Sequence, residues 1–200
     1  MLADKSTRHR RHEQTRARIL TAAKQLLREK GLARFSLRGV AAASDYSPAG
    51  LYEYFDSKEE LLATIARGIE SELRTALLKS DSLGDHAPLV NMGLSYIKFA
   101  SNHPEDYLLL FTTFSSGRRG NSEQLPESSA YMVLYALVKE LVETGEINLR
   151  EGEGIEEICY HYWVMLHGHV MMQLTHLKGY EADFDQVVLN MLNRFMASIQ

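Results

Sequence analysis

Arg38, Glu53 and Lys58 are three of the charged residues in a stretch, residues 36–61, that is rich in alanine, serine and tyrosine. An arginine guanidinium can donate two hydrogen bonds to the O6 and N7 atoms of guanine. A glutamate can accept from cytosine N4, although it fits a solvated surface equally well, and the sequence leaves both roles open. A lysine at a helix N-terminus adds its charge to the helix dipole and favours phosphate. Together these groups predict chemistry with DNA.

Pro48, Ala49 and Gly50 stand between these charged residues and offer almost no hydrogen-bonding side chain. Direct reading of bases is therefore expected to be sparse. Small residues instead let a backbone approach DNA closely and touch thymine methyl groups. The remaining candidates for base contacts are Arg38, Glu53 and Tyr54.

The elements that must position these residues are two short helices and the start of a third. Ser36 and Ser47 are each placed to cap a helix N-terminus, and Ser57 with Glu60 forms a capping box for the third helix. Asp45 lies where the chain must turn sharply, and aspartate tolerates the left-handed conformation. This pattern predicts a helix-turn-helix, whose second helix fits a DNA major groove.

The same stretch resembles the DNA-binding domain of TetR/AcrR-type transcriptional regulators, over residues 13–73. Two departures stand out: Asp45 replaces the usual glycine, and Gly50 replaces a common hydroxyl residue. The resemblance is carried by Arg16-Ala17-Arg18-Ile19-Leu20, Ala22-Ala23, Gly31, Phe35-Ser36, Val40-Ala41, Tyr46-Ser47, Leu51-Tyr52, Tyr54-Phe55 and residues 57–61.

The resemblance implies a role for individual positions. It implies that Arg38 reaches a base edge, although a contact to phosphate alone stays open. Tyr52 could instead be a core aromatic and Lys58 an ordinary surface charge, whereas Leu51 and Phe55 are assigned to the core. The positions that match phosphate-binding residues of the family are Ser36, Ser47, Tyr52, Tyr54 and Lys58.

The charge of the chain is divided unevenly. Residues 1–40 hold 11 Lys/Arg against 3 Asp/Glu, whereas residues 41–200 hold 11 against 23, so a basic end (+8) precedes an acidic body (−12). Positive potential beside the helix-turn-helix suits phosphate binding. Residues 1–12 are expected to be a basic flexible arm, either a solvated tail or a segment that orders in a minor groove.

Composition narrows the class of protein further. Cys159 is the single cysteine, which excludes an internal disulfide and fits a reducing cytoplasm. The apolar runs are far shorter than the roughly 18 residues that a membrane-spanning helix needs. A cytoplasmic protein without a membrane partner is therefore expected.

The periodicity of apolar residues predicts helices throughout and an all-α fold. The N-terminal three-helix helix-turn-helix domain should be followed by a C-terminal helical ligand-binding and dimerisation domain over residues 85–200. The expected helices cover 13–30, a longer one that opens at the Ser57 capping box and runs to about 77, 88–102, 105–114, 128–144, 155–177 and 184–199, with loops at 115–124 and 145–154.

The C-terminal part also resembles a regulatory domain named WHG, over about residues 85–195. The matching residues are Tyr96, Phe99-Ala100, His103-Pro104, residues 107–111 and above all Trp163-x-x-x-His167-Gly168. The resemblance implies that this region dimerises through its last two helices and holds an effector pocket.

Aromatic and methionine side chains are frequent in this region and suit an amphipathic or aromatic ligand, although any helical core also needs them. As a set they favour a cavity. The residues predicted to bind ligand are Phe99, Phe111, Tyr135, Trp163 and His167.

Four histidines on the long helix invite a metal hypothesis. At about 100° per residue, His169 and His176 share a face with His161 nearby, whereas His167 points away. Zinc needs three or four converging ligands, so neutral, hydrogen-bonded histidines are favoured and no cofactor is expected.

The chain shows no glycine-rich phosphate loop and no HExxH motif, and Cys159 and His161 diverge by about 200° on a helix. These residues do not predict an enzyme. They predict a homodimeric transcriptional regulator, most simply a repressor released from a palindromic operator by a small apolar or aromatic effector. The rivals are a helical scaffold and a small-molecule- or metal-binding protein with vestigial DNA binding. An apolar stripe on the last helix favours the dimer: Val187, Val188, Met191, Leu192, Phe195 and Ile199.

Overall fold

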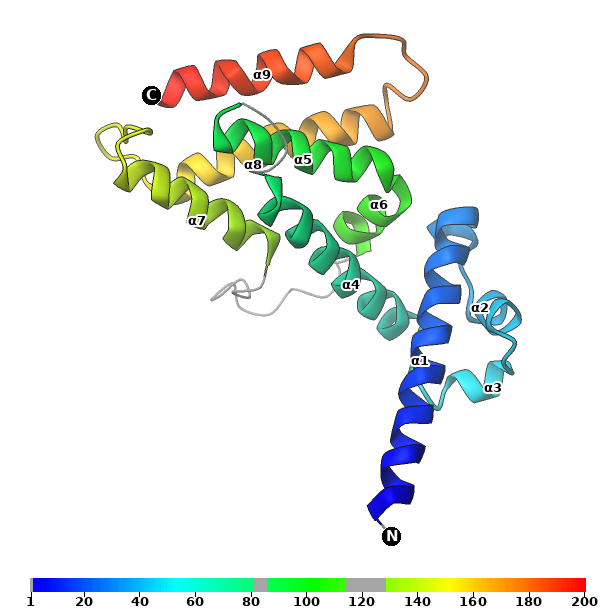
Figure 1. The fold of residues 1–200 in the computed structure, drawn as a ribbon. Coiled ribbons are helices and arrows are strands. Elements are labelled where there is room, and N and C mark those ends of the chain that lie inside the picture. Colours follow the sequence, from blue (N-terminus) through cyan, green and yellow to red (C-terminus); the bar gives the residue numbers. More distant parts are fainter. Residues whose placement is uncertain (1, 81–85, 114–128) are drawn as a thin grey trace. The chain divides into compact units, whose positions relative to one another are not determined.

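The computed structural model describes residues 2–80, 86–113 and 129–200, and the secondary structure of these residues is helical without any strand (Figure 1). The predicted all-α fold is confirmed. None of the helices in these ranges combines the length and apolar character that a membrane crossing requires. The loop expected at 115–124 lies outside the described residues.

The chain divides into two compact units. The first comprises Met1–Ile69 and Glu105–Gly120, and the second comprises Glu70–Pro104 and Asn121–Gln200. Helix α4 (Lys58–Leu78) therefore contributes its first half to one unit and its second half to the other.

The first unit contains α1 (Leu2–Lys30), α2 (Leu37–Ser44), α3 (Pro48–Leu51), the first half of α4, and α6 (Pro104–Thr113). A short 3-10 helix, Leu32–Arg34, connects α1 to α2. Apolar side chains from these helices form one core. Its buried members include Ile19, Ala23, Leu27, Val40, Leu51, Phe55, Leu61 and Ile65.

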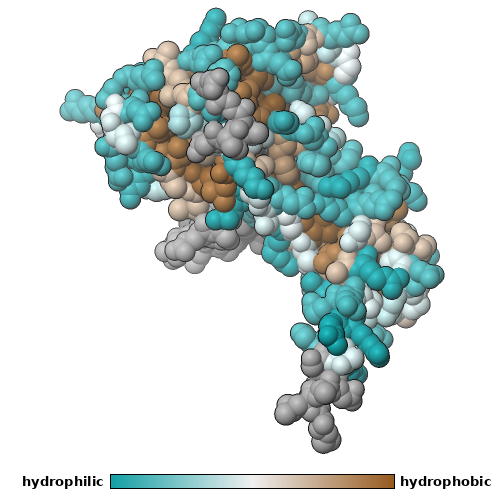
Figure 2. Space-filling model, in the orientation of Figure 1, coloured by the Kyte–Doolittle hydropathy of each residue, from teal (hydrophilic) through white to brown (hydrophobic). Residues whose placement is uncertain are grey.

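Helix α1 is longer than expected. It begins at Leu2, so the segment expected to be a flexible arm continues the helix and projects past α3 (Figure 1). Neither glycine nor proline occurs between residues 2 and 30, so nothing interrupts the helix until Gly31, whose φ is +68°. The described part of the projecting end of α1 is mostly teal, and therefore hydrophilic, in Figure 2.

A buried carboxylate ties α6 to α1 within this unit. The Asp106 side chain is completely buried, and its Oδ2 atom accepts from Arg28 Nη2 at 2.5 Å and from Arg28 Nε at 3.1 Å. Lys24 Nζ lies 3.6 Å from the same oxygen. Two cations therefore compensate the cost of burying this charge.

We expect Arg28→Met to destabilise the protein by about 3 kcal/mol, because it removes both arginine hydrogen bonds and leaves the fully buried carboxylate with Lys24 alone, 3.6 Å away. Asp106→Asn should cost less, since the Arg28 side chain is 44 % exposed and can turn to water. Urea unfolding of both variants and of the double variant measures this. If Asp106→Asn proves the more damaging change, the carboxylate is not what Arg28 stabilises.

The second unit is built around α5 (Pro88–Asn102), most of which is buried. It packs against α7 (Ala130–Glu143), α8 (Ile155–Leu174) and α9 (Phe184–Ile199). Gly93 allows this close packing, because a Cβ atom there would lie 2.4 Å from the Tyr162 hydroxyl and 2.6 Å from a Leu192 methyl. The Tyr162 hydroxyl donates to the carbonyl oxygen of Leu89.

The apolar stripe of α9 mainly serves this core rather than a dimer interface. Val188, Leu192 and Ile199 are buried within their own unit, whereas Val187 is 51 % exposed. Helix α9 buries this face against α5 of the same protomer, so no second protomer is needed to cover it. The stripe therefore gives little evidence for a dimer, and the exposed side chains must be considered instead.

Candidate functional site

Two serine caps and one left-handed residue shape the connection between α2 and α3. Ser36 Oγ accepts from Gly39 N at 3.2 Å, and Ser47 Oγ accepts from Gly50 N at 3.0 Å. Asp45 has φ 58° and ψ 45° and turns the chain between the helices. The predicted caps and turn are confirmed, and each serine keeps its own hydroxyl hydrogen as a donor.

Helix α3 is a single turn, which continues as a tighter turn instead of a longer helix. Glu53 N donates to Gly50 O and Tyr54 N donates to Leu51 O, both with i to i−3 spacing. Tyr52, Glu53 and Tyr54 therefore lie on this turn rather than on the helix itself. Tyr52 and Glu53 on this turn are exposed, whereas Tyr54 is half-buried.

The third helix start holds Lys58 above an aromatic ring. Ser57 Oγ accepts from Glu60 N at 3.0 Å, while the Glu60 carboxylate accepts from Asp56 N rather than from Ser57 N. The capping box thus closes one residue earlier than predicted. Lys58 Nζ lies 5.8 Å from the centre of the Phe35 ring, which gives this lysine a defined position.

The structure leaves nearly all of the predicted DNA-contacting side chains accessible. Tyr52 is 57 % exposed, which excludes its alternative as a core aromatic, whereas Leu51 and Phe55 are buried as assigned. Gly50, Tyr54 and Lys58 are half-buried. The exposed candidates are Ser36, Arg38, Ser47, Pro48, Ala49, Tyr52 and Glu53.

Two residues of α1 that the sequence reasoning missed also meet this region. The His12 ring stacks on Tyr54 with 4.5 Å between ring centres, and the Arg16 guanidinium lies 4.8 Å from the centre of the Phe55 ring. The hydroxyls of Tyr54 and Tyr46 lie 3.1 Å apart. This hydrogen bond raises the pKa of Tyr46. His12 and Arg16 are four residues apart, which places them on the same face of a helix, and this spacing is the signal in the sequence that could have identified them.

In the second unit an aromatic cluster surrounds Trp163 of α8. Its ring centre lies 5.5 Å from that of Tyr96 on α5 and 6.0 Å from that of Tyr131 on α7. Tyr135, also on α7, donates to Glu156 Oε1 at 3.5 Å. Rings from three helices therefore meet around the single tryptophan.

The five predicted ligand-binding residues do not all belong to this unit. Phe99 is buried on α5, and Trp163 and His167 are half-buried on α8. Phe111 belongs instead to the first unit, where its ring centre lies 4.6 Å from that of Tyr107. Four candidates, including Tyr135, therefore share one unit and the fifth does not.

His167 and His169 of α8 are half-buried, and Cys159 is buried. Burial lowers the pKa of His167 and of His169, which favours their neutral forms. Burial likewise raises the pKa of the Cys159 thiol to about 12. Within the described ranges, no group of three or more His, Cys, Asp and Glu residues is arranged to hold a metal ion.

Comparison with known protein families shows which family this chain belongs to. Residues 19–65 match the family described as bacterial regulatory proteins of the tetR family, and residues 89–195 match the tetracyclin repressor-like C-terminal domain. The chain belongs to the TetR family. It is thus a transcriptional regulator with a DNA-binding domain, in a family of regulators and not of enzymes.

Curated relatives of this TetR-family protein match over the DNA-binding region. An uncharacterized HTH-type transcriptional regulator of Mycobacterium bovis, Mb0790c, is 41 % identical over 63 residues, which cover 32 % of this chain and 30 % of the relative. YfiR of Bacillus subtilis, also described as uncharacterized, is 35 % identical over 74 residues, which cover 37 % and 35 %. The chain thus matches about a third of the length of these relatives.

Solved structures share the fold over nearly the whole chain. A Rhodococcus protein of unknown function has a TM-score of 0.76 at 22 % identity and covers 92 % of this chain and 95 % of its own. A TetR-family regulator of Marinobacter aquaeolei has a TM-score of 0.65 at 20 % identity, with coverage of 96 % and 98 %. RolR in complex with resorcinol has a TM-score of 0.59 at 20 % identity, with coverage of 92 % and 88 %.

The space beside Gly50 is occupied by neighbouring side chains in this structure. A Cβ atom there would lie 2.9 Å from the Tyr46 ring and 3.1 Å from Ser47 Oγ. The Tyr46 ring occupies the space that a side chain at position 50 would need. This TetR-family protein therefore combines a bulky residue at 46 with glycine at 50.

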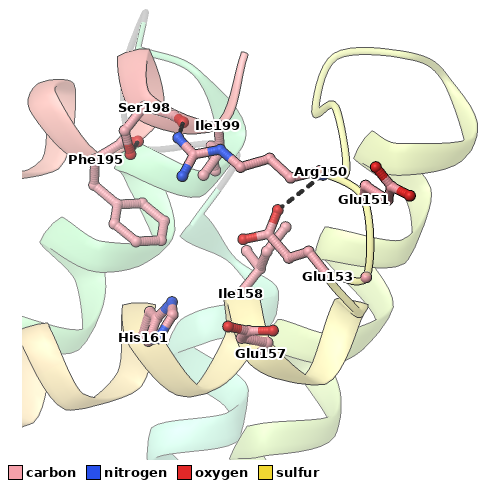
Figure 3. Close-up of a pocket in the computed structure, with 10 residues that line it drawn as sticks. Arg150, Glu151, Glu153, Glu157, Ile158, His161, Phe195, Ser198 and Ile199 are labelled. Atoms are coloured by element: carbon pink, nitrogen blue, oxygen red, sulfur yellow. Dashed lines mark hydrogen bonds between the residues drawn. The ribbon is translucent and has the colours of Figure 1, made fainter.

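A polar cleft of about 350 Å³ at the end of α9 is explained by helix capping (Figure 3). The Arg150 guanidinium donates to the carbonyl oxygen of Ser198 at 2.9 Å, and Asn148 N donates to that of Ile199 at 2.8 Å. These donors form hydrogen bonds to the last carbonyl groups of α9. The positive charge of Arg150 also interacts favourably with the negative end of the helix dipole. None of the five predicted ligand-binding residues lines this cleft.

Proposed function

We propose that this TetR-family protein is a homodimeric repressor that binds a palindromic operator and is released by a small-molecule effector. The observation that carries the proposal is the accessible surface formed by Ser36, Arg38, the turn of α3, Tyr52 and Lys58. The domains of this regulator are proposed as 13–73 for DNA and 85–200 for effector binding and dimerisation, in the cytoplasm. Two such surfaces would enter successive major grooves about 34 Å apart.

The contacts divide into positioning and reading. Hydroxyls of Ser36, Ser47 and Tyr52, together with Tyr54 and Lys58, are proposed to bind phosphates, which fix the register of the protein without reading sequence. Arg38, exposed on the first turn of α2, is proposed to read guanine.

The small residues of α3 are proposed to act differently. Because Pro48, Ala49 and Gly50 carry so little side chain, the backbone of α3 can approach the groove closely and contact thymine methyl groups. Glu53 is exposed and is proposed to accept from cytosine N4. Sparse direct contacts predict tolerance of sequence changes at several operator positions.

The effector is proposed to bind beside Trp163 in the second unit, where Phe99, Tyr135 and His167 supply apolar and aromatic surface. Neutral histidines and aromatic rings favour an uncharged apolar or aromatic compound. The fold neighbour RolR, whose structure contains resorcinol, supports a ligand of this class. Moving the operator from nearly full to nearly empty requires a preference of about 10⁴-fold for the released state.

The test is selection of DNA from a random duplex pool by the full-length protein. We expect an inverted repeat to emerge and its binding to weaken steeply with salt. Recovery of no common sequence, with salt-insensitive binding, would instead favour the rival scaffold or a small-molecule-binding protein with vestigial DNA binding.

We expect a neutral phenol from a panel that includes resorcinol to change Trp163 fluorescence saturably and to lower affinity for the selected duplex. Trp163 is the single tryptophan, so the signal reports on this cluster. Tyr135→Ala should weaken that phenol about tenfold, roughly 1.4 kcal/mol, while Tyr180→Ala, at a 66 % exposed loop residue, should not. A panel in which no compound has both effects contradicts the proposed release.

A further inference from the structure

The first turns of α1 carry positive charges that have no role in the DNA-binding surface proposed for α2 and α3. Arg8, Arg10 and Arg11 are exposed, and this part of the helix projects past α3 (Figure 1). The helix is continuous here, so the direction of each side chain follows from its position in the sequence.

Arg8 lies on the same face of α1 as the residues that pack in the core of the first unit. Ile19 and Ala23 are buried on the face of α1 that packs in the first unit. Continuing the same spacing of three or four residues toward the N-terminus leads to Arg16, His12 and Arg8. At about 100° per residue these five positions lie within roughly 80° of arc. The face that packs inside the unit therefore becomes cationic where α1 leaves it.

Two contacts hold this face beside the residues that follow α3. His12 stacks on Tyr54, with 25° between the ring planes, and the Arg16 guanidinium lies over the Phe55 ring. Arg8 follows one turn further out, about 6 Å along the axis from His12. It therefore extends beyond Tyr54 on the side of α1 that faces the α3 region.

We propose that the projecting turns of α1 are a second, ordered DNA-contacting element, in which Arg8 binds a backbone phosphate beside the groove entered by α3. His12 is a positioning residue that holds the helix against Tyr54. The inference rests on the proposed function, because it requires DNA at α3. It replaces a flexible arm in the minor groove with a helix that follows the backbone.

Arg8→Ala and Arg10→Ala form a matched pair, since each removes one positive charge and the two positions lie about 200° apart on the helix. Binding of full-length variants to the selected duplex is measured from 50 to 200 mM salt. Arg8→Ala removes one phosphate contact from each protomer of the proposed dimer, so we expect the slope of log K against log salt to fall by about 1.8. Wild type then loses about 12-fold more affinity over this range. Arg10→Ala should keep the wild-type slope.

Substitution of His12 tests the positioning role. The Arg8→Ala effect should shrink in a His12→Ala background and persist in His12→Phe, which retains a ring to stack on Tyr54. A phosphate contact carries no sequence information, so a scrambled duplex should show the same change in slope. An Arg8→Ala effect that is independent of the residue at position 12 would overturn the positioning role.

Equal losses for Arg8→Ala and Arg10→Ala would show a diffuse charged tail and overturn the inference, as would no loss for either. If Arg38→Ala with Lys58→Ala abolishes binding while Arg8→Ala leaves it intact, only this inference fails. If the double variant also binds like wild type, the proposed function itself fails.

Discussion

Replacing Arg38 and Lys58 together by alanine is expected to weaken binding to the selected duplex roughly 100-fold. A bidentate arginine–guanine contact is worth about 1–3 kcal/mol, and the lysine supplies a phosphate contact on top of it. Arg38 is exposed and Lys58 half-buried, and alanine is compatible with both helices. Titration by fluorescence anisotropy measures the loss.

The single variants should differ in kind. Arg38→Ala should relax the preference at one position of each half-site. Lys58→Ala should weaken selected and scrambled duplexes alike and lower the salt slope by about 1.8, because the proposed dimer loses two phosphate contacts. If Arg38→Ala affects both duplexes equally, this arginine touches phosphate alone.

The matched control for the double variant removes two positive charges elsewhere. Arg67 lies on α4, about 13 Å along the axis from Lys58, and Lys139 lies on α7 in the second unit. Arg67→Ala with Lys139→Ala should bind nearly as wild type does. Equal weakening in both double variants would reduce the effect to net charge.

Local signals were predicted well, because the physics behind them is local. A serine cap needs only its own hydroxyl and an amide three residues on, and Ser36 and Ser47 both form that bond. Asp45 adopts the left-handed conformation that its place between two helices required. The fold of the helix-turn-helix could therefore be inferred from capping and turn residues, which act over only a few positions of the sequence.

Features that depend on distant residues could not be inferred in this way. The close fit of Gly93 to the Tyr162 hydroxyl appears only once both residues are placed. The stripe of α9 has the same sequence pattern whether it packs on α5 or on a second protomer. Likewise, nothing in the sequence around Phe111 indicates that it belongs to the first unit.

The exposed apolar side chains of α8 give a better guide to a dimer than the α9 stripe. Tyr160 is 64 % exposed, Val164 49 % and Met172 45 %, with a spacing of four or eight residues that places them along one side of the helix. Gly168 continues the same series, and a Cβ atom there would meet nothing within 4 Å. Small and apolar residues in one row suit a close helix–helix contact with a second copy.

We therefore expect Val164→Glu to convert the proposed homodimer to a monomer, because two buried carboxylates would face each other across its twofold axis. Loss of the second helix-turn-helix should lower the affinity for the selected inverted repeat about 10²- to 10⁴-fold, since binding of the second half-site is no longer intramolecular. Sedimentation velocity and anisotropy measure the two effects. Ala136→Glu, at an exposed position of α7, adds the same charge and should leave both unchanged. A Val164→Glu protein that stays dimeric would show that this row of α8 does not form the interface.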